Sequence, residues 1–265
     1  MQELFLFVIC ICATTLGAIS GIGGGVIIKP VMAAVSGMSV STISFLSGCT
    51  VLSMSVVSLL RSRGDDVKIV PKQGTCLALG GAVGGLVGKW IFDMVKSAFA
   101  NDGLIGTVQS VLMVILTVGV LIYVLNKQRI HTLRVTNAFA CVVIGLALGI
   151  LSSFLGIGGG PINLAVLYFF FSMDSKTAAL NSLYVILFSQ CASFLSTVIQ
   201  GKIPEFSPLV LVVMIVGGVA GGFIGRAISK KLDNRKVDLL FRGMLILITA
   251  ISCYNLFRYA SVLAG

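Results

Sequence analysis

Charged residues are scarce in this sequence: only 11% of its 265 residues are Asp, Glu, Lys or Arg, whereas 57% are hydrophobic. Soluble globular domains carry about one quarter charged residues, so this scarcity excludes the soluble class. The mean hydropathy of +1.08 predicts an integral membrane protein. Because no basic segment precedes the apolar run after Met1-Gln2-Glu3, we expect this run to be a retained first helix rather than a cleaved signal.

The residues that usually carry catalysis or bind metals are also few. The chain has one histidine, His131, and its seven cysteines form no CxxC pair, so the converging donors of a metal site are missing. No HExxH, GxSxG or Walker lysine motif occurs, and the carboxylates lie in loops or near segment ends. We therefore predict that the protein is not an enzyme and binds no metal or cofactor. The cysteines are expected to be small buried hydrophobes, with a thiol facing a substrate path as the alternative.

A net charge of +10 raises the question of nucleic acid. The basic residues stand in short loops between apolar segments, with no aromatic platform beside them. An excess of Lys and Arg in such loops is typical of the cytoplasmic side of membrane proteins. We therefore expect the lipid bilayer, and no nucleic acid, among the partners.

The apolar segments form two sets of five. A run of glycines at 21–25 recurs 135 positions later at 156–160, and the stretch 80–89 recurs at 217–226. We therefore predict an all-α polytopic membrane protein with a first repeat at 1–130 and a second repeat at 131–265, which together form one transmembrane domain. The expected helices are 4–20, 24–36, 39–60, 70–92 and 104–125, then 136–155, 160–172, 176–199, 206–228 and 237–260.

The segments that follow the glycine runs are too short for a full crossing, since 13 residues span about 20 Å. Each one either crosses with its glycine end below the membrane surface, or joins the preceding segment in one broken crossing. Five crossings per repeat divide seventeen basic residues thirteen to four, with Lys89, Lys96, Lys202 and Arg258 on the sparse side, whereas four crossings divide them nine to eight.

The positive-inside rule favours the uneven division, and therefore five crossings per repeat. An odd number of crossings inverts the second repeat relative to the first, as in many secondary transporters. We expect a multi-pass protein of the plasma (inner) membrane of a bacterial-type cell, with basic loops in the cytoplasm and both termini outside.

The glycine runs are the first candidate binding site. Glycine disfavours helix by about 1 kcal/mol relative to alanine, so each run should break a helix within the membrane. The helix that follows begins with free N–H groups and a partial positive charge, which favour an anion. The alternative is that the glycines only allow close helix crossing. The candidate substrate-binding residues are Gly21, Gly23, Gly24, Gly25, Gly156, Gly158, Gly159, Gly160 and Pro161, where the proline suits a first helical position.

Three side chains extend this candidate site. Lys29 lies four residues after the first glycine run, where it either adds a positive charge to an anion pocket or snorkels to the membrane surface. Asn181 and Ser182 stand on a hydroxyl-rich segment, as do many polar residues of 39–60. These polar side chains either line a substrate path or make interhelical hydrogen bonds, and for the set as a whole we favour the second reading.

Glycines recur at every fourth position in 80–88 and 217–225. This small-xxx-small spacing lets helix backbones approach closely. The favoured interpretation is packing within the membrane domain. A homodimer through these glycine-rich helix faces is a second arrangement that the spacing allows.

The sequence resembles a known family. The first glycine run with Pro30, and the second with Pro161 and the stretch 176–182, are similar to the two signatures of the sulfite exporter TauE/SafE family of the toluene sulfonate uptake permease superfamily. The resemblance extends over both halves. It implies passage of small sulfur-containing anions, such as sulfite, thiosulfate, sulfonates and sulfoacetate, without ATP. The chain departs from the family pattern at Lys29 and at Ala165, which leave the particular anion open.

The sequence therefore predicts a secondary transporter, an exporter or permease, that moves a small anion by alternating access between the glycine runs. A non-transporting membrane scaffold or sensor, or an anion channel, is the alternative.

Overall fold

Apolar helices form nearly the whole of the computed structural model, which describes residues 2–62, 67, 69–99, 102–127, 129–157 and 159–264. Within these ranges there are ten helices and no strands. They are α1 (Gln2–Ser20), α2 (Gly25–Val35), α3 (Val40–Ser62), α4 (Pro71–Phe99), α5 (Asp102–Asn126), α6 (Ala138–Leu155), α7 (Pro161–Phe171), α8 (Ser175–Ile199), α9 (Pro208–Lys231) and α10 (Asn234–Ala264). The predicted all-α fold and its ten segments are confirmed.

Eight of these helices are long and apolar enough to cross a membrane, whereas α2 and α7 have 11 residues each. The largest difference from the expected boundaries is in α4, which continues to Phe99 rather than ending at 92. An ion pair between Lys89 and Asp93, 2.7 Å apart and four residues along the helix, supports this additional length. The charged end of α4 is therefore helix rather than loop.

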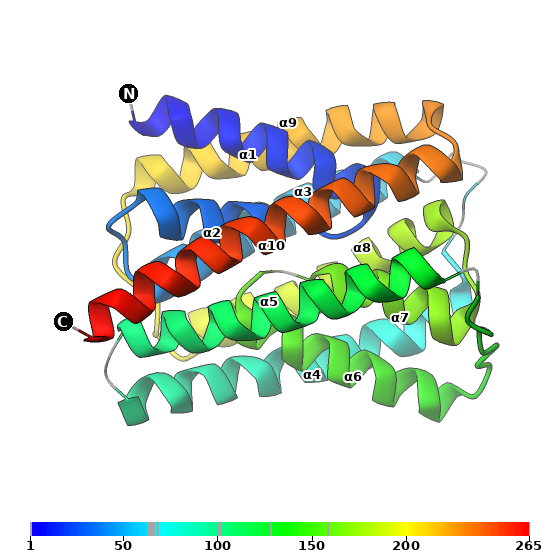
Figure 1. Cartoon of the computed structure of the whole chain (residues 1–265), viewed down its shortest axis with the longest axis horizontal. Coiled ribbons are helices and arrows are strands. Elements are labelled where there is room, and N and C mark those ends of the chain that lie inside the picture. The colour runs from blue at the N-terminus through cyan, green and yellow to red at the C-terminus, as the bar shows by residue number, and fades with distance from the viewer. Residues whose placement is uncertain are drawn as a thin grey trace.

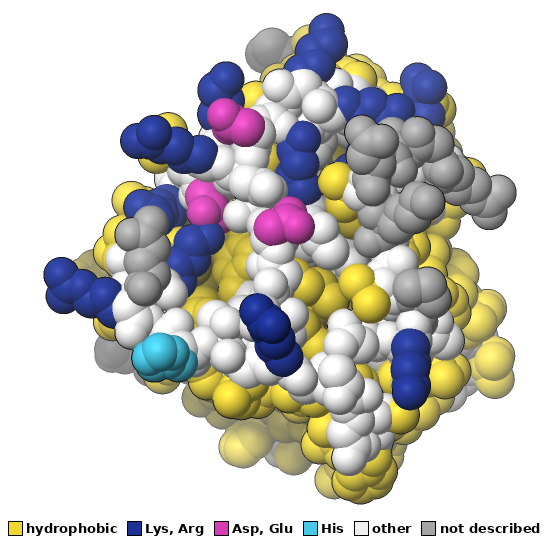
Figure 2. Space-filling model, turned by 90° about the vertical axis from the view of Figure 1, so that its right-hand side faces the viewer, with side chains coloured by type: hydrophobic (Ala, Val, Ile, Leu, Met, Phe, Trp, Pro, Cys, Tyr) yellow, Lys and Arg dark blue, Asp and Glu magenta, His cyan; other side chains and the backbone are white. Residues whose placement is uncertain are grey.

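The helices lie roughly side by side, so the molecule has two ends (Figure 1). One end carries the connections α3–α4, α5–α6, α7–α8 and α9–α10, and we call it the basic end. Figure 2 looks onto this end and shows Lys and Arg side chains crowded over it. The other end, the terminal end, carries both termini and the connections α2–α3, α4–α5 and α8–α9 (Figure 1). The basic residues thus gather at one end, as expected if each repeat crosses the membrane five times.

The chain reverses direction at each glycine run. From the first run α2 returns toward the terminal end, where α1 began, and from the second run α7 returns toward the basic end, where α6 began (Figure 1). Neither pair forms one continuous broken crossing, so that alternative is wrong. The glycines of the first run are all buried, as are Gly159 and Gly160 of the second, so both turns lie inside the molecule.

Two helix pairs are packed through glycine faces. In α4, Gly80, Gly84 and Gly88 lie against the backbone of α6, where added Cβ atoms would overlap carbonyl groups. In α9, Gly217, Gly221 and Gly225 lie against α1, where added Cβ atoms would overlap side-chain or carbonyl atoms. Along each pair, residues with higher numbers on one helix contact residues with higher numbers on the other, so the paired helices run parallel. The close packing predicted from the small-xxx-small spacing is therefore made within the chain.

These two pairs are copies of one another. Gly84 meets Leu146, and Gly221 meets Ile11, which is 135 positions before Leu146. In each case a helix of one repeat packs on a helix of the other, so the repeats interlock instead of forming separate lobes. The glycine faces are covered inside the chain. A homodimer through these faces, the second arrangement that the spacing allows, stays a prediction.

Large apolar side chains also cover the outside of the helices. Trp90 is 60% exposed, Ile115 is 61% exposed and Phe257 is 80% exposed. An outer surface of this kind suits lipid rather than water. Inside, one buried apolar cluster surrounds both glycine turns and includes Ile22, Leu46, Leu164 and Phe241.

The glycine packing makes a first prediction. Replacing Gly84 by leucine should lower the free energy of unfolding by about 3 kcal/mol, because the new side chain would force α4 away from the carbonyl of Leu146. The melting temperature of the detergent-solubilised protein measures the effect. Gly119→Leu is the matched control, since a Cβ at this exposed position of α5 has no atom within 4 Å. Equal melting temperatures for the two variants would contradict the packing role.

Candidate functional site

The two glycine turns meet in the interior of the protein. A Cβ on Gly25 would overlap the carbonyl group of Ile157, and a Cβ on Gly160 would lie 3.1 Å from the Ile157 side chain and 3.9 Å from Val26. The turns need glycine for their backbone shape too, since φ is +78° at Gly21, +79° at Gly23, +62° at Gly156 and +121° at Gly159. The two runs, far apart in sequence, therefore form one central junction.

The starts of the two short helices are packed in this junction. Gly24 is the N-cap of α2, Gly160 is the N-cap of α7, and Pro161 is the first residue of α7. The space beside Gly25 is taken by Ile157, and Gly159, Gly160 and Pro161 line a hollow of only about 10 Å³. Gly158 lies outside the described residues. Anion binding by these helix starts stays a prediction.

Asn181 and Ser182 lie on α8 and bond to backbone. The Ser182 hydroxyl donates to the carbonyl of Gly21 at 2.6 Å, which holds the first glycine turn. The Asn181 amide donates to the carbonyl of Thr177 at 2.8 Å, and its oxygen accepts from the N–H of Val70 at 3.2 Å. In this structure both side chains tie elements together, and a direct contact with substrate stays a prediction.

Lys29 points into the protein. Its side chain is buried, and its Nζ donates to Ser44 Oγ at 2.8 Å, to Gln109 Oε1 at 2.7 Å and to the carbonyl of Leu155. Since Leu155 is the last residue of α6, the positive charge lies at the negative end of that helix dipole. Snorkelling to the membrane surface does not occur here. Lys29 instead links α2 to three helices, two of them from its own repeat and one from the other.

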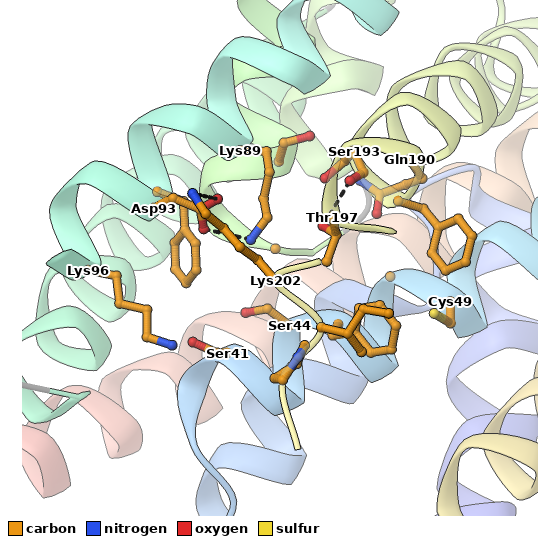
Figure 3. A pocket seen from close by; sticks show the side chains of 18 of the residues that line it. Ser41, Ser44, Cys49, Lys89, Asp93, Lys96, Gln190, Ser193, Thr197 and Lys202 are labelled. Atoms are coloured by element: carbon orange, nitrogen blue, oxygen red, sulfur yellow. Dashed lines mark hydrogen bonds and ion pairs between the residues drawn. The ribbon is translucent and has the colours of Figure 1, made fainter. Parts of the chain in front are cut away.

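A cavity of about 580 Å³ lies above this junction, toward the terminal end, and Figure 3 looks into it. We call it the lysine cavity. Its wall consists of the first half of α3, the last turns of α4 and α8, the end of α6, and the α8–α9 connection. Its residues are Ser41, Ser44, Phe45, Gly48, Cys49, Lys89, Phe92, Asp93, Lys96, Ser97, Ser153, Gly156, Gln190, Ser193, Phe194, Thr197, Lys202, Ile203 and Pro204.

The charge in the lysine cavity is positive. Its lining holds three lysines and one carboxylate, a net charge of +2. Asp93 lies 2.7 Å from Lys89 Nζ and 3.8 Å from Lys202 Nζ, whereas Lys96 makes no ion pair with any residue in the described ranges. Figure 3 shows the amino group of Lys96 beside Ser41. Such a surface attracts anions.

The floor of the lysine cavity supplies polar groups without charge. Gly156, Ser44 and Ser153 lie there, and Gln190 lines the wall. Within the described part of the chain, Ser153 Oγ and Gln190 Nε2 have no hydrogen-bond partner, although both residues are only 6% exposed. Buried polar groups are normally paired, so these two are available to a ligand or to water.

The sequence did not single out these lysines. Lys89, Lys96 and Lys202 are three of the four basic residues on the sparsely charged side. The sequence uses them only to count charges on the two sides of the membrane, and it does not predict that they share a site. The fourth, Arg258, donates to the carbonyls of Ala33 and Ala34 at the end of α2. Of the predicted site residues, Gly156 lines the lysine cavity, and Lys29 lines a hollow of about 30 Å³ beside it.

Comparison with known proteins agrees with this architecture. The family model described as "Sulfite exporter TauE/SafE" matches residues 6–252, nearly the whole chain. The chain belongs to the TauE/SafE family. It is 24% identical over 275 residues to the "Probable membrane transporter protein YunE" of Bacillus subtilis (strain 168), with 94% of this chain and 96% of the relative covered. No solved structure matches the chain significantly.

Family membership confirms the resemblance seen in the glycine signatures and makes the protein a multi-pass membrane transporter. The junction of the two glycine turns is the structural counterpart of those signatures, because both turns contribute backbone to it.

The bonds of Lys29 make a second prediction. Lys29→Met should lower the free energy of unfolding by about 2 kcal/mol, because Gln109 Oε1 and the carbonyl of Leu155 would lose a charged donor inside the protein. Thermal melting in detergent measures this loss. Lys202→Met is the control, since the side chain of Lys202 is 57% exposed and should contribute little to stability. A Lys29→Met variant that melts like the wild type would show that these bonds add nothing.

Proposed function

We propose that the protein is a secondary transporter that moves a small sulfur-containing anion across the plasma membrane of a bacterial-type cell. The observation that carries the proposal is the lysine cavity, which leads from the terminal end to the junction of the two glycine turns. The name of the family, sulfite exporter, supports sulfite, thiosulfate or an organosulfonate as the substrate class. This transport requires no catalytic residue and no cofactor.

The cavity lining favours an anion over a cation. Its net charge of +2 and its free donor groups, such as Gln190 Nε2, fit an oxyanion, whose oxygens accept hydrogen bonds. Its volume of about 580 Å³ has room for a hydrated inorganic anion or for an organosulfonate. Phe45 and Phe194, whose rings lie 6.1 Å apart, would contact an organic part of such a substrate.

A carrier explains the closed floor better than a channel does. Below Gly156 the packing continues through Ile157, which is 3% exposed, and Val26, which is 0% exposed. Transport past this barrier requires the barrier to move, as in alternating access. In the proposed orientation the basic end faces the cytoplasm, the repeats are inverted relative to each other, and both termini and the mouth of the lysine cavity face outside.

Flux into proteoliposomes tests the proposal. The purified protein should give saturable uptake of at least one anion among sulfite, thiosulfate and organosulfonates, with chloride as the comparison anion, and unlabelled substrate on the far side should accelerate uptake. Unsaturable flux without such acceleration would indicate a channel. No flux of any of these anions through intact protein would exclude the transporter and support a scaffold or sensor.

The lysines of the cavity make a third prediction. Lys89→Met should raise the KM for the transported anion about tenfold, because it removes one positive charge and leaves Asp93 with a weaker partner, a change worth about 1.4 kcal/mol. Arg258→Gln is the control at the same end, since Arg258 bonds to the end of α2 and does not line the cavity. Concentration dependence of initial uptake measures both. An unchanged KM in Lys89→Met would remove Lys89 from the binding site.

A further inference from the structure

The lysine cavity lies at the terminal end only. Because the chain is duplicated, each part of the cavity wall has a counterpart in the other repeat. Its wall from α4 and α8 corresponds to α9 and α3. The helix contacts support this correspondence: Gly85 of α4 lies against Ser189 of α8, and Gly222 of α9 lies against Met54 of α3, which is 135 positions before Ser189. The two pairs are therefore packed in the same register.

The same register assigns a counterpart to individual residues of the lysine cavity. Lys89 follows Gly85 by one helical turn, and Arg226 follows Gly222 by one turn. On the partner helices, a shift of 135 positions pairs Gln190 with Ser55, Ser193 with Ser58, and Thr197 with Ser62. The counterparts are again one basic residue and a row of polar side chains.

Lys89, Gln190 and Ser193 line the lysine cavity, whereas their counterparts Arg226, Ser55 and Ser58 line neither this cavity nor the hollow beside α3 at the other end. Ser55 and Ser58 are 0% exposed, and Arg226 is 6% exposed. Among the described residues, Ser55 Oγ and Ser58 Oγ have no hydrogen-bond partner. Leaving a hydroxyl buried and unpaired costs about 1–3 kcal/mol. These two hydroxyls would gain hydrogen-bond partners if the surface opened to an anion or to water.

The buried group lies toward the basic end. Both α3 and α9 reach that end with the turns that carry Ser58 and Arg226 (Figure 1). A hollow of about 390 Å³ reaches α3 there, and its lining includes Leu59, Ser62, Leu180 and Tyr184 but neither Ser58 nor Arg226. The polar group is therefore covered by packed helices, and a separation of α9 from α3 would open it.

We propose that Arg226, Ser55 and Ser58 form a second anion-binding surface, which opens to the basic end when the lysine cavity closes. This proposal rests on the proposed transport function. Arg226 supplies the positive charge that Lys89 supplies in the lysine cavity, and a guanidinium group can hold an oxyanion through two parallel hydrogen bonds. The two serine hydroxyls donate to the same ligand, or to water once the surface is open.

In this proposal the two surfaces open in turn, so that one is covered by helix packing whenever the other is open. In the present structure Gly222 of α9 covers Ser58 of α3, while the end of α4 lies across the cavity from Gln190 and Ser193. In the alternative state α4 covers Gln190 and Ser193, and α9 uncovers Ser55 and Ser58. A small anion released at the central junction then leaves through the second surface.

Cysteine labelling tests the second surface. In a background with the seven native cysteines replaced by alanine, which must retain saturable anion uptake, Ser58→Cys and Ser193→Cys are introduced separately. A membrane-impermeant thiol reagent is applied to one side of proteoliposomes of known orientation, during sulfite or thiosulfate transport. We expect Ser193→Cys to react only from the terminal end and Ser58→Cys only from the basic end. Leu46→Cys, on α3 and 0% exposed within the apolar cluster, should react from neither side.

The outcomes separate the two proposals. If the background transports but Ser58→Cys fails to react, or reacts only from the terminal end, the second surface is wrong while the transport function stands. If the background and the wild type both transport no anion, the transport function itself fails. Equal reaction of Leu46→Cys and Ser58→Cys from the basic end would also overturn the proposal, because it would indicate general opening of α3.

A second measurement addresses Arg226. Arg226→Gln should raise the KM for anion applied at the basic end about tenfold or more, and the KM at the terminal end by much less. Arg226→Lys should restore part of the loss, because it keeps the charge but not the paired geometry. Equal increases at both ends would assign Arg226 a structural role and contradict its place in a one-sided surface.

Discussion

Close contact between helix backbones through glycine is the constraint on which this structure depends. Where Gly84 meets Leu146 and Gly221 meets Ile11, the glycine lets the two helix backbones come into close contact. In a membrane, where apolar surface gives little preference for one helix over another, such close packing supplies the specificity. Each of these contacts joins helices of different repeats, so neither half can complete its packing alone.

The same interlocking brings the two glycine turns together. Because α1 is held by α9 and α6 by α4, the ends of α1 and α6 are directed to one central junction, where Gly25 lies against Ile157. Lys29 secures this junction from one side only, through Ser44, Gln109 and Leu155. Its counterpart in the second repeat, Leu164, is apolar and fully buried. The junction is thus symmetric in backbone and asymmetric in charge.

The asymmetry extends to the surfaces on either side of the junction. At the terminal end three lysines line an open cavity, and at the basic end Arg226 and its neighbouring serines are covered. One sequence pattern, repeated, has thus produced an open and a closed surface in a single structure. A transporter needs this combination, because an anion path open at both ends at once would dissipate its gradient.

The features that the sequence predicts best are those with a local signal. Hydropathy located ten segments within a few residues, except at the end of α4, where charged residues continue the helix. The glycine spacing of 80–88 predicted close packing, but not its partner α6, because a small-residue face fits any other helix that offers a flat surface. Lys29 was recognised as unusual, but its partners come from α3, α5 and α6 and could not be read from its neighbours.

The membrane class, the duplication and the gathering of basic residues at one end all follow from composition and from residue order along the chain. Which polar residues line a cavity and which are covered depends instead on how the helices pack. Helices that are apolar on every side carry no contrast between an inner and an outer face. Lys89, Gln190 and Lys202 therefore become one site only when α4, α8 and the α8–α9 connection are packed together.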